Sequence, residues 1–395
     1  MLILRVIVTM NPSYGGPCQG IRNSIPALSR FGIDNEVVCF DEDDVDYGIE
    51  DSFLIHRIGR GVGPYSFNSR LESWSAKNLG RFDIVIVHGL WLHTSFGMYK
   101  AWSKFKRHRT KFPSLYIMPH GMLDPYFQKS KDRRFKAIRN SIFWHLFEKR
   151  VINGVDGVLF TCEMELELAK QAFFGYNPKK AVNIGYGIQR PPAFNAQMDG
   201  EFRAISGLKE DDRYFLFLSR IHEKKGIDLL VKAYMNLTDS GMFSSLPKLV
   251  IAGPLLGRYA ELMQKIASHQ NNIVFTGMLQ GNAKWGALYS AESFILPSHQ
   301  ENFGIAVVES LACGTPVLIT NKINIWKEID EGKGGLIEQD DAEGVRNLLV
   351  RWIELQDKER SEYRKSARKT YEEYFTVESA ASQFCKRLEI DAHTS

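Results

Sequence analysis

Short apolar runs of strand length alternate with stretches of helical periodicity along this chain, and this alternation restricts its fold more than any other feature. Such an order is typical of parallel strands joined by crossover helices. Helical periodicity is clearest over 227–237 and 343–355. The predicted strands are 2–9, 36–40, 83–88, 115–119 and 156–161, followed by 214–219, 248–252, 272–276, 293–297 and 316–319. The sequence therefore predicts an α/β fold.

The chain has 395 residues, which exceeds the size of one typical hydrophobic core. Glycine and proline cluster between residues 185 and 200, so we expect the linker there. The predicted domains are residues 1–190 and residues 191–376, each built around a parallel sheet.

Composition excludes several classes of protein. Hydrophobic residues make up 44% of the chain and charged residues 24%, as in ordinary globular proteins. No apolar run reaches the roughly 18 residues of a membrane span, and no basic segment precedes the first apolar run, as a signal peptide would require. The five cysteines are scattered without a Cys-x-x-Cys pair, which favours a reducing compartment. We expect a cytoplasmic protein.

Two glutamates eight residues apart, Glu301 and Glu309, give the strongest functional signal. A helix is expected to begin near Gly304 and end at Gly314, with Glu301 in the loop above it. At about 1.5 Å per residue the pair spans roughly 12 Å, the distance from the sugar ring to the ribose of a nucleotide sugar. The alternative is a surface helix with two solvated glutamates.

Cations and glycines follow other predicted strands of the second half. Arg220 ends a strand and Lys225 opens the next helix, a placement that suits a diphosphate. Gly253 ends another strand, at the sheet edge where ligands of parallel sheets bind. The residues that follow the strand at 272–276 are Gly277, Met278 and Leu279.

Strand ends of the first half carry further candidates. Gly15 and Gly16 follow the first strand and allow close backbone approach to a phosphate or sugar, unless they only form a tight turn. His120 follows the strand at 115–119, and His88 holds a similar place. A structural role is the alternative for both histidines, and His222 could simply be exposed.

These segments carry a family resemblance. Residues 298–317 resemble the donor-sugar motif of retaining glycosyltransferases of family 4, and residues 219–228 resemble the diphosphate-binding segment of that family. Shorter matches occur at 119–125, 251–254 and 274–277. The resemblance implies the GT-B fold, in which two Rossmann-like domains face each other across a cleft. It also implies that the C-terminal helix, 377–395, returns to the N-terminal domain.

The resemblance also implies roles for these residues. Glu309 would accept hydrogen bonds from the ribose, and Glu301 from the 3- or 4-hydroxyl of the sugar. Arg220 and Lys225 would stabilise the departing phosphate, and His120 would line the face where positive charge develops. The nucleotide base would lie against Gly277, Met278 and Leu279, and the backbone N–H groups of Asn302, Phe303 and Gly304 would assist Glu301.

No metal or other cofactor is expected. The acidic run Asp41–Asp46 imitates an Asp-x-Asp metal motif, but no other candidate ligand lies beside it. We therefore interpret it as a solvated loop.

The predicted function is metal-independent, anomer-retaining transfer of a hexose in polysaccharide biosynthesis. UDP-glucose or a similar UDP-hexose is the expected donor, and a saccharide or lipid-linked saccharide is the expected acceptor. The alternatives are a sugar-nucleotide epimerase of the same fold and a non-catalytic nucleotide-sugar-binding protein. No nucleic-acid-binding motif is present, so nucleic acid is not an expected partner.

Residues 100–150 form a basic region, with 14 Lys and Arg against three acidic residues. Within it, residues 132–150 place apolar side chains at helical spacing among cations, a pattern typical of helices that lie on anionic membranes. This predicts peripheral attachment at the inner face of the membrane. The alternative is that the apolar stripe packs on the N-terminal sheet and the charges are solvated.

Overall fold

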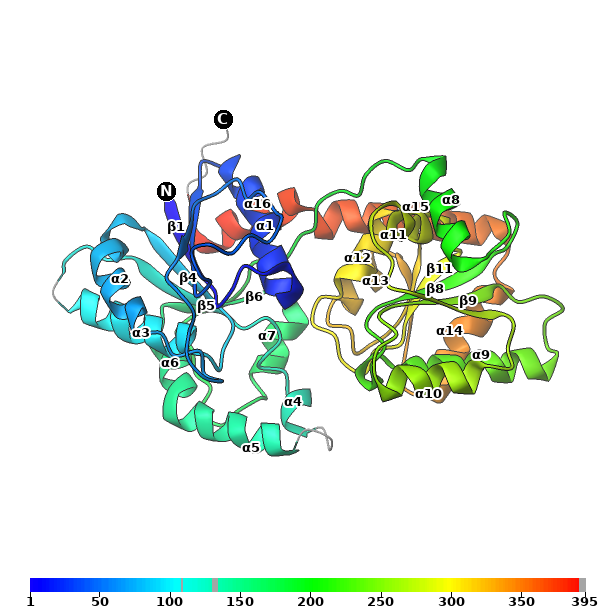
Figure 1. Cartoon of the computed structure of the whole chain (residues 1–395), viewed down its shortest axis with the longest axis horizontal. Coiled ribbons are helices and arrows are strands. Elements are labelled where there is room, and N and C mark those ends of the chain that lie inside the picture. The colour runs from blue at the N-terminus through cyan, green and yellow to red at the C-terminus, as the bar shows by residue number, and fades with distance from the viewer. Residues whose placement is uncertain (108, 130–133, 391–395) are drawn as a thin grey trace. The chain divides into compact units, whose positions relative to one another are not determined.

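The computed structural model describes residues 1–107, 109–129 and 134–390. The chain divides into two compact units (Figure 1). The N-terminal unit comprises Met1–Gly187 together with the C-terminal segment from Val377, and the C-terminal unit comprises Ile188–Thr376.

A seven-stranded parallel sheet forms the centre of the N-terminal unit, in the order β3-β2-β1-β4-β5-β6-β7. Its strands are β1 (Leu2–Val6), β2 (Asp34–Cys39), β3 (Ile55–Arg57), β4 (Ile84–His88), β5 (Ser114–Met118), β6 (Gly157–Phe160) and β7 (Ala181–Asn183). Because successive side chains point to opposite faces of a strand, the buried central strands supply a core on each face.

Helices cover both faces of this sheet. Leu4 and Val6 pack on one face with residues of α2 (Arg70–Asn78) and α3 (His93–Lys106). Ile3 packs on the other face with residues of α1 (Gly16–Ser29) and α16 (Val377–Leu388). Helix α16 lies beside α1, so the end of the chain belongs to the N-terminal unit (Figure 1).

The C-terminal unit has a six-stranded parallel sheet in the order β10-β9-β8-β11-β12-β13. Its strands are β8 (Tyr214–Leu218), β9 (Lys248–Ala252), β10 (Ile273–Gly277), β11 (Ser293–Leu296), β12 (Val317–Thr320) and β13 (Gly335–Glu338). The helices between and after them are α9 (Ile227–Ser240), α10 (Arg258–Ala267), α11 (Gly281–Ser290), α12 (Ile305–Ala312), α13 (Trp326–Glu331), α14 (Ala342–Glu354) and α15 (Asp357–Thr370). Two parallel sheets with crossover helices confirm the α/β prediction.

Three strands escaped prediction, namely β3, β7 and β13. All three are short and lie at sheet edges, where a strand needs no continuous apolar run. The predicted linker, 185–200, also extends too far, because helix α8 (Ala196–Ser206) begins inside it. The side chain of Asn195 caps this helix by accepting the Met198 N–H at 3.1 Å.

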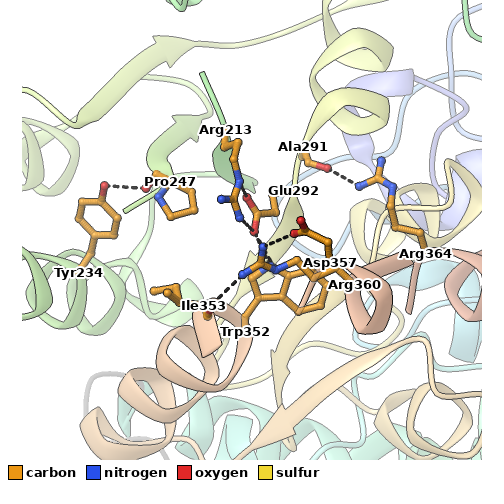
Figure 2. Close-up of polar contacts among 10 residues, drawn as sticks. All are labelled: Arg213, Tyr234, Pro247, Ala291, Glu292, Trp352, Ile353, Asp357, Arg360 and Arg364. Carbon is orange, nitrogen blue, oxygen red and sulfur yellow. Dashed lines mark hydrogen bonds and ion pairs between the residues drawn. The ribbon is translucent and has the colours of Figure 1, made fainter. Parts of the chain in front are cut away.

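A polar cluster ties α14 and α15 to the sheet of the C-terminal unit (Figure 2). Glu292, which precedes β11, accepts two hydrogen bonds at 2.6 Å from Arg213, which precedes β8. It also accepts the indole N–H of the buried Trp352 of α14 at 3.0 Å. Arg364 of α15 donates to the Ala291 carbonyl at 2.8 Å. These contacts fix the amino ends of the strands and leave the loops at the carboxyl ends for the site.

Candidate functional site

A close backbone approach at the carboxyl ends of β8 and β11 organises the site in the C-terminal unit. Gly226 has φ +64°, and a Cβ there would lie 1.9 Å from the Pro297 carbonyl oxygen, so only glycine fits. The neighbouring His299 N–H donates to the Lys224 carbonyl at 2.9 Å. The turn that carries Lys225 is thereby held against the loop that carries Glu301.

Lys225 and Glu301 form an ion pair, and their side chains are only 9% and 20% exposed. The backbone of Glu301 is fixed on both sides, because its N–H donates to the Lys322 carbonyl and its carbonyl accepts from the Asn324 N–H, each at 2.9 Å. The structure thus brings together two predicted site residues. The expected pairing of Lys225 with Arg220 differs from what is found, since the ammonium group of Lys225 contacts Glu301.

The charge of Glu301 follows from these contacts. Burial alone would raise the pKa of its carboxyl group, but the charges of Lys225 and Lys224, the hydrogen bond from Lys225 and the N–H of Asn302 lower the pKa below the ordinary value. Glu301 is therefore an ionised acceptor at neutral pH. The N–H of Asn302, predicted to assist at the sugar, donates to this carboxylate.

Helix α12 begins after Gly304, as predicted, and carries Glu309. The Glu309 carboxylate lies 2.6 Å from the Nζ atom of Lys284 on α11, and both side chains are largely buried. Lys284 was not predicted, because no motif in the sequence links α11 to α12. Both candidate glutamates are consequently ion-paired, which contradicts the alternative of two solvated glutamates.

The remaining candidates of this unit divide into backbone and side-chain positions. Phe303 is buried and packs edge-on against Phe375 at 5.8 Å between ring centroids, so its side chain belongs to the core. A Cβ on Gly253 would lie 2.0 Å from the Ser219 carbonyl oxygen, and its N–H donates to the Gly277 carbonyl at 2.9 Å. These glycines join the ends of β8, β9 and β10.

Three other predicted residues of this unit differ in exposure. Met278 is exposed at the tip of the loop after β10, whereas the adjacent Leu279 is buried. Arg220 is exposed, and within the described ranges it forms no hydrogen bond or ion pair. Met278 and Arg220 are therefore accessible to a ligand.

In the N-terminal unit, the predicted glycine turn precedes α1. Gly15 has φ +91° and caps α1, and its N–H donates to the Pro12 carbonyl at 3.1 Å. No atom lies within 4 Å of a Cβ built on Gly15 or Gly16. The segment is thus a tight turn, and it also has open space beside both glycines.

His120 and His88 are joined. His120 Nε2 lies 2.9 Å from His88 Nδ1, and the rings are stacked with centroids 5.1 Å apart. His120 has φ +53°, which is unusual outside glycine. Burial, followed by the charge of Arg5, lowers the pKa of His120 to about 3. The imidazole is therefore neutral at physiological pH. His222 has a different role, because its ring accepts the Lys224 N–H at 3.0 Å.

The acidic run Asp41–Asp46 is only partly a solvated loop, and the prediction is wrong for Asp41. Its buried carboxylate accepts hydrogen bonds from Thr9 Oγ1 at 2.5 Å, the Met10 N–H at 2.8 Å and Tyr47 at 2.9 Å. It therefore fastens the end of β2 to the segment after β1. Within residues 1–107, 109–129 and 134–390, no group of three His, Cys, Asp or Glu side chains is placed to hold a metal ion.

Residues 198–370 match the family model described as glycosyl transferases group 1. This match lies within the C-terminal unit, Ile188–Thr376. An uncharacterized glycosyltransferase of Methanocaldococcus jannaschii is 28% identical over 166 residues, which are 40% of this chain and 41% of the relative. The alpha-monoglucosyldiacylglycerol synthase of Streptococcus pneumoniae is 30% identical over 173 residues, 42% of this chain and 38% of the relative. The chain thus spans less than half the length of these relatives.

Two solved structures resemble the whole chain. Sucrose-phosphate synthase from Thermosynechococcus elongatus has a TM-score of 0.72 at 18% identity and covers 98% of both chains. Anabaena Alr3699/HepE, in complex with UDP and glucose, has a TM-score of 0.72 at 16% identity and covers 98% of this chain and 99% of its own. These similarities, together with the two parallel sheets, confirm the predicted GT-B fold.

The basic helix of the N-terminal unit contradicts the alternative that its apolar stripe packs on the sheet. It comprises α5 (Arg134–Phe143), a π-helical turn (Trp144–Glu148) and α6 (Lys149–Gly154), while residues 130–133 lie outside the described ranges. Its inner face is made by Trp144 and Glu148, which are fully buried. Its apolar stripe is exposed instead of packed on the sheet. The stripe consists of Phe135, Ile138, Ile142 and Leu146, exposed by 91%, 60%, 53% and 60%.

Glu148 shows how the inner face of this helix is held. Its carboxylate accepts the Trp91 N–H at 2.9 Å and the Ser95 hydroxyl at 2.6 Å. Burial raises the pKa of Glu148 to about 7. Because Glu148 and Trp144 occupy the inward positions, the stripe must point outward. Among the described residues, no helix is long and apolar enough to cross a membrane.

Replacing Lys225 by methionine tests the ion pair. We expect the free energy of unfolding at pH 7 to fall by about 2 kcal/mol, because the Glu301 carboxylate would be left partly buried without its cation. The loss should be full above pH 4.5, the ordinary pKa of glutamate, and should fade as the pH falls through the lower pKa of the folded state. Urea denaturation across this range measures it.

Lys232→Met is the matched control, since Lys232 pairs with Asp228 on the surface of α9 at 3.6 Å. It should change stability by less than about 0.5 kcal/mol. Equal losses in the two variants, or a Lys225→Met loss that does not depend on pH, would contradict the assigned pairing.

Proposed function

We propose that this protein transfers a hexose from a nucleoside diphosphate sugar to a hydroxyl group of a saccharide or lipid-linked saccharide in polysaccharide biosynthesis. The proposed donor is UDP-glucose or a similar UDP-hexose, and the reaction retains the anomeric configuration. The proposal is carried by one observation: Glu301, in the loop before α12, and Glu309, on α12, each form an ion pair with a lysine in the region that matches the group 1 model. The binding of UDP and glucose by a structure of the same fold supports this choice.

The donor would bind along this segment. Glu309 accepts hydrogen bonds from the ribose hydroxyls, and Glu301 accepts them from the 3- or 4-hydroxyl of the sugar. Both carboxylates are oriented by lysines, and hydrogen bonds from neutral hydroxyls to a carboxylate are charge-assisted. Met278 is exposed and offers an apolar side chain to one face of the base. Gly277 and Leu279 complete this loop.

The departing diphosphate is proposed to be stabilised by protein cations. The bond between the anomeric carbon and the diphosphate oxygen breaks while a bond to the acceptor oxygen forms on the same side. The acceptor proton moves to the departing phosphate. Arg220, with its unengaged guanidinium, and Lys225, shared with Glu301, meet the negative charge that develops. No metal is required in this scheme.

His120 belongs to the N-terminal unit, and its proposed role rests on the family resemblance. A positively charged sugar-like transition state is destabilised by a nearby cation. The low pKa of His120, about 3, keeps the imidazole neutral and avoids that repulsion. The open space beside Gly15 and Gly16 would admit part of a substrate.

Incubation with labelled UDP-glucose in EDTA tests this function. We expect UDP-glucose to raise the Tm more than GDP-mannose or ADP-glucose at the same concentration. At 100 times its Kd, a ligand stabilises the folded protein by about 2.7 kcal/mol. We also expect UDP to be released in EDTA when a saccharide acceptor is added. Activity that EDTA abolishes and manganese restores contradicts the metal-free scheme. Conversion to another UDP-hexose without acceptor would indicate an epimerase.

The exposed stripe of α5 supports a further part of the proposal, namely contact with an anionic membrane. Cations flank the stripe, and from Arg134 to Phe147 no acidic residue occurs. Four large apolar side chains in water are unfavourable for a helix whose other face is already packed. Insertion of the stripe at a lipid surface would bury them, and each nearby Lys or Arg adds about 1 kcal/mol. The protein would then work on lipid-linked acceptors from the cytoplasmic face.

Cosedimentation with phosphatidylglycerol vesicles measures this contact. The protein should sediment with the vesicles at low salt and less so at high salt, because the attraction is screened. Changing Arg134, Lys136 and Arg139 to glutamate should abolish sedimentation, and Ile142→Asp should weaken it at every salt concentration.

The control variant carries Lys365→Glu and Lys369→Glu on α15 of the other unit, and it should sediment like the wild type. Arg133 belongs to the same basic segment but lies outside the described residues, so the test does not use it. A wild-type protein that stays in the supernatant at low salt would show that the region is only a solvated face.

A further inference from the structure

The N-terminal unit encloses a cavity of about 50 Å³ on the face of its sheet that α1 and α16 cover. This exceeds the roughly 30 Å³ that one water molecule occupies in the liquid. The lining combines polar groups from β1, β4 and α1 with apolar residues of α16. None of the lining residues is acidic: they are Arg5, Gly20, Ser24, Leu28, His88, Met118, His120, Ile184, Gly185, Tyr186, Gly187, Val377, Ala380, Ala381 and Phe384.

Arg5 is the unusual member of this lining. It occupies a central strand, is 2% exposed, and among the described residues has no carboxylate partner. Its Nε atom donates to Asn35 Oδ1 at 3.0 Å, and its guanidinium lies 5.6 Å from the centroid of the Phe384 ring. A buried cation without a counter-ion is costly, and burial lowers the pKa of Arg5 to about 10.

His88 also has a polar atom without a partner. Its Nδ1 atom contacts His120, whereas its Nε2 atom is buried and has no hydrogen-bond partner. When His120 Nε2 donates to His88 Nδ1, the proton of the neutral His88 ring lies on Nε2, which becomes a donor. Buried polar atoms are nearly always paired, so this atom indicates a missing partner.

Tyr186 and Gly20 shape the cavity. The Tyr186 hydroxyl donates to the Gly16 carbonyl at 2.9 Å, and a Cβ on Gly20 would lie 2.4 Å from that hydroxyl oxygen. Because Gly20 has no side chain, the Tyr186 ring has room to reach the start of α1. Ser24 provides another hydroxyl to the lining. The cavity thus contains a cation and the unpaired His88 Nε2 atom, and no acidic residue lines it.

We propose that this cavity binds a small oxyanion, a phosphate or carboxylate group, held by the Arg5 guanidinium and His88 Nε2–H. The oxyanion supplies the counter-ion that Arg5 lacks and the acceptor that His88 lacks. It comes from free inorganic phosphate or from an anionic group of a larger ligand. The proposal concerns the N-terminal unit alone and does not rest on the proposed function.

Thermal unfolding of the full chain in increasing phosphate tests the proposal. Ionic strength is held constant with sodium chloride, whose anion is not an oxyanion. We expect a saturable rise in Tm with phosphate. If inorganic phosphate has no effect but glucuronate or glucose 6-phosphate raises the Tm, the oxyanion is part of a larger ligand.

Three variants test whether the rise in Tm comes from binding in this cavity. Arg5→Met removes the cation at similar volume and should abolish the rise. Ala380→Leu fills the cavity without touching a charge and should also abolish it, so the test stands if Arg5→Met does not fold. Arg30→Met is the control, because Arg30 directly follows α1 and makes an exposed ion pair with Glu378 of α16. It should respond like the wild type.

Two results would overturn the proposal. One is that none of the three anions raises the Tm of the wild type in a saturable way. The other is that Arg5→Met and Ala380→Leu respond as strongly as the wild type, which would place the anion elsewhere. Neither result bears on the transfer of hexose, since no nucleotide sugar is present.

Discussion

The approach of Gly226 to the carbonyl of Pro297 is the constraint on which the candidate site depends. Any side chain at Gly226 would collide with the carbonyl oxygen of Pro297, which follows β11. The turn after β8 would then have to move away from the loop that holds Glu301. Lys225 would then lose the carboxylate that it contacts. A single backbone contact at the ends of neighbouring strands thus determines where a buried cation and a partly buried anion meet.

The same arrangement of charge recurs at the other end of α12, where Lys284 holds Glu309. A partly buried carboxylate without a cation would take up a proton more readily and bind hydroxyl groups less well. The lysines lower the pKa of Glu301, and Lys284 holds the Glu309 carboxylate in place. We propose that two acceptors within residues 301–309 are thereby placed for the sugar and the ribose of a donor.

The sequence predicted the parallel sheets because their central strands are continuous apolar runs, and it predicted α12 because glycines mark both ends. It did not predict β3, β7 or β13, since short edge strands carry little apolar signal. Lys284 was missed because its partner is distant in sequence. The sequence did not decide whether the apolar stripe of the basic helix is exposed or packed on the sheet. Only the structure shows that Trp144 and Glu148 take the inward positions. Asp41 was predicted to be solvated because it begins an acidic run, whereas its carboxylate accepts a hydrogen bond from the segment after β1.

We propose that residues 301–309 bind the two ends of a nucleotide sugar through different glutamates. Calorimetric titration of Glu301→Gln and Glu309→Gln with UDP and with UDP-glucose tests it most directly. Glu309→Gln should weaken both ligands by a similar factor, because both carry the ribose. Glu301→Gln should leave the affinity for UDP nearly unchanged and remove the additional affinity for UDP-glucose. Equal UDP affinities in the two variants would contradict the claim.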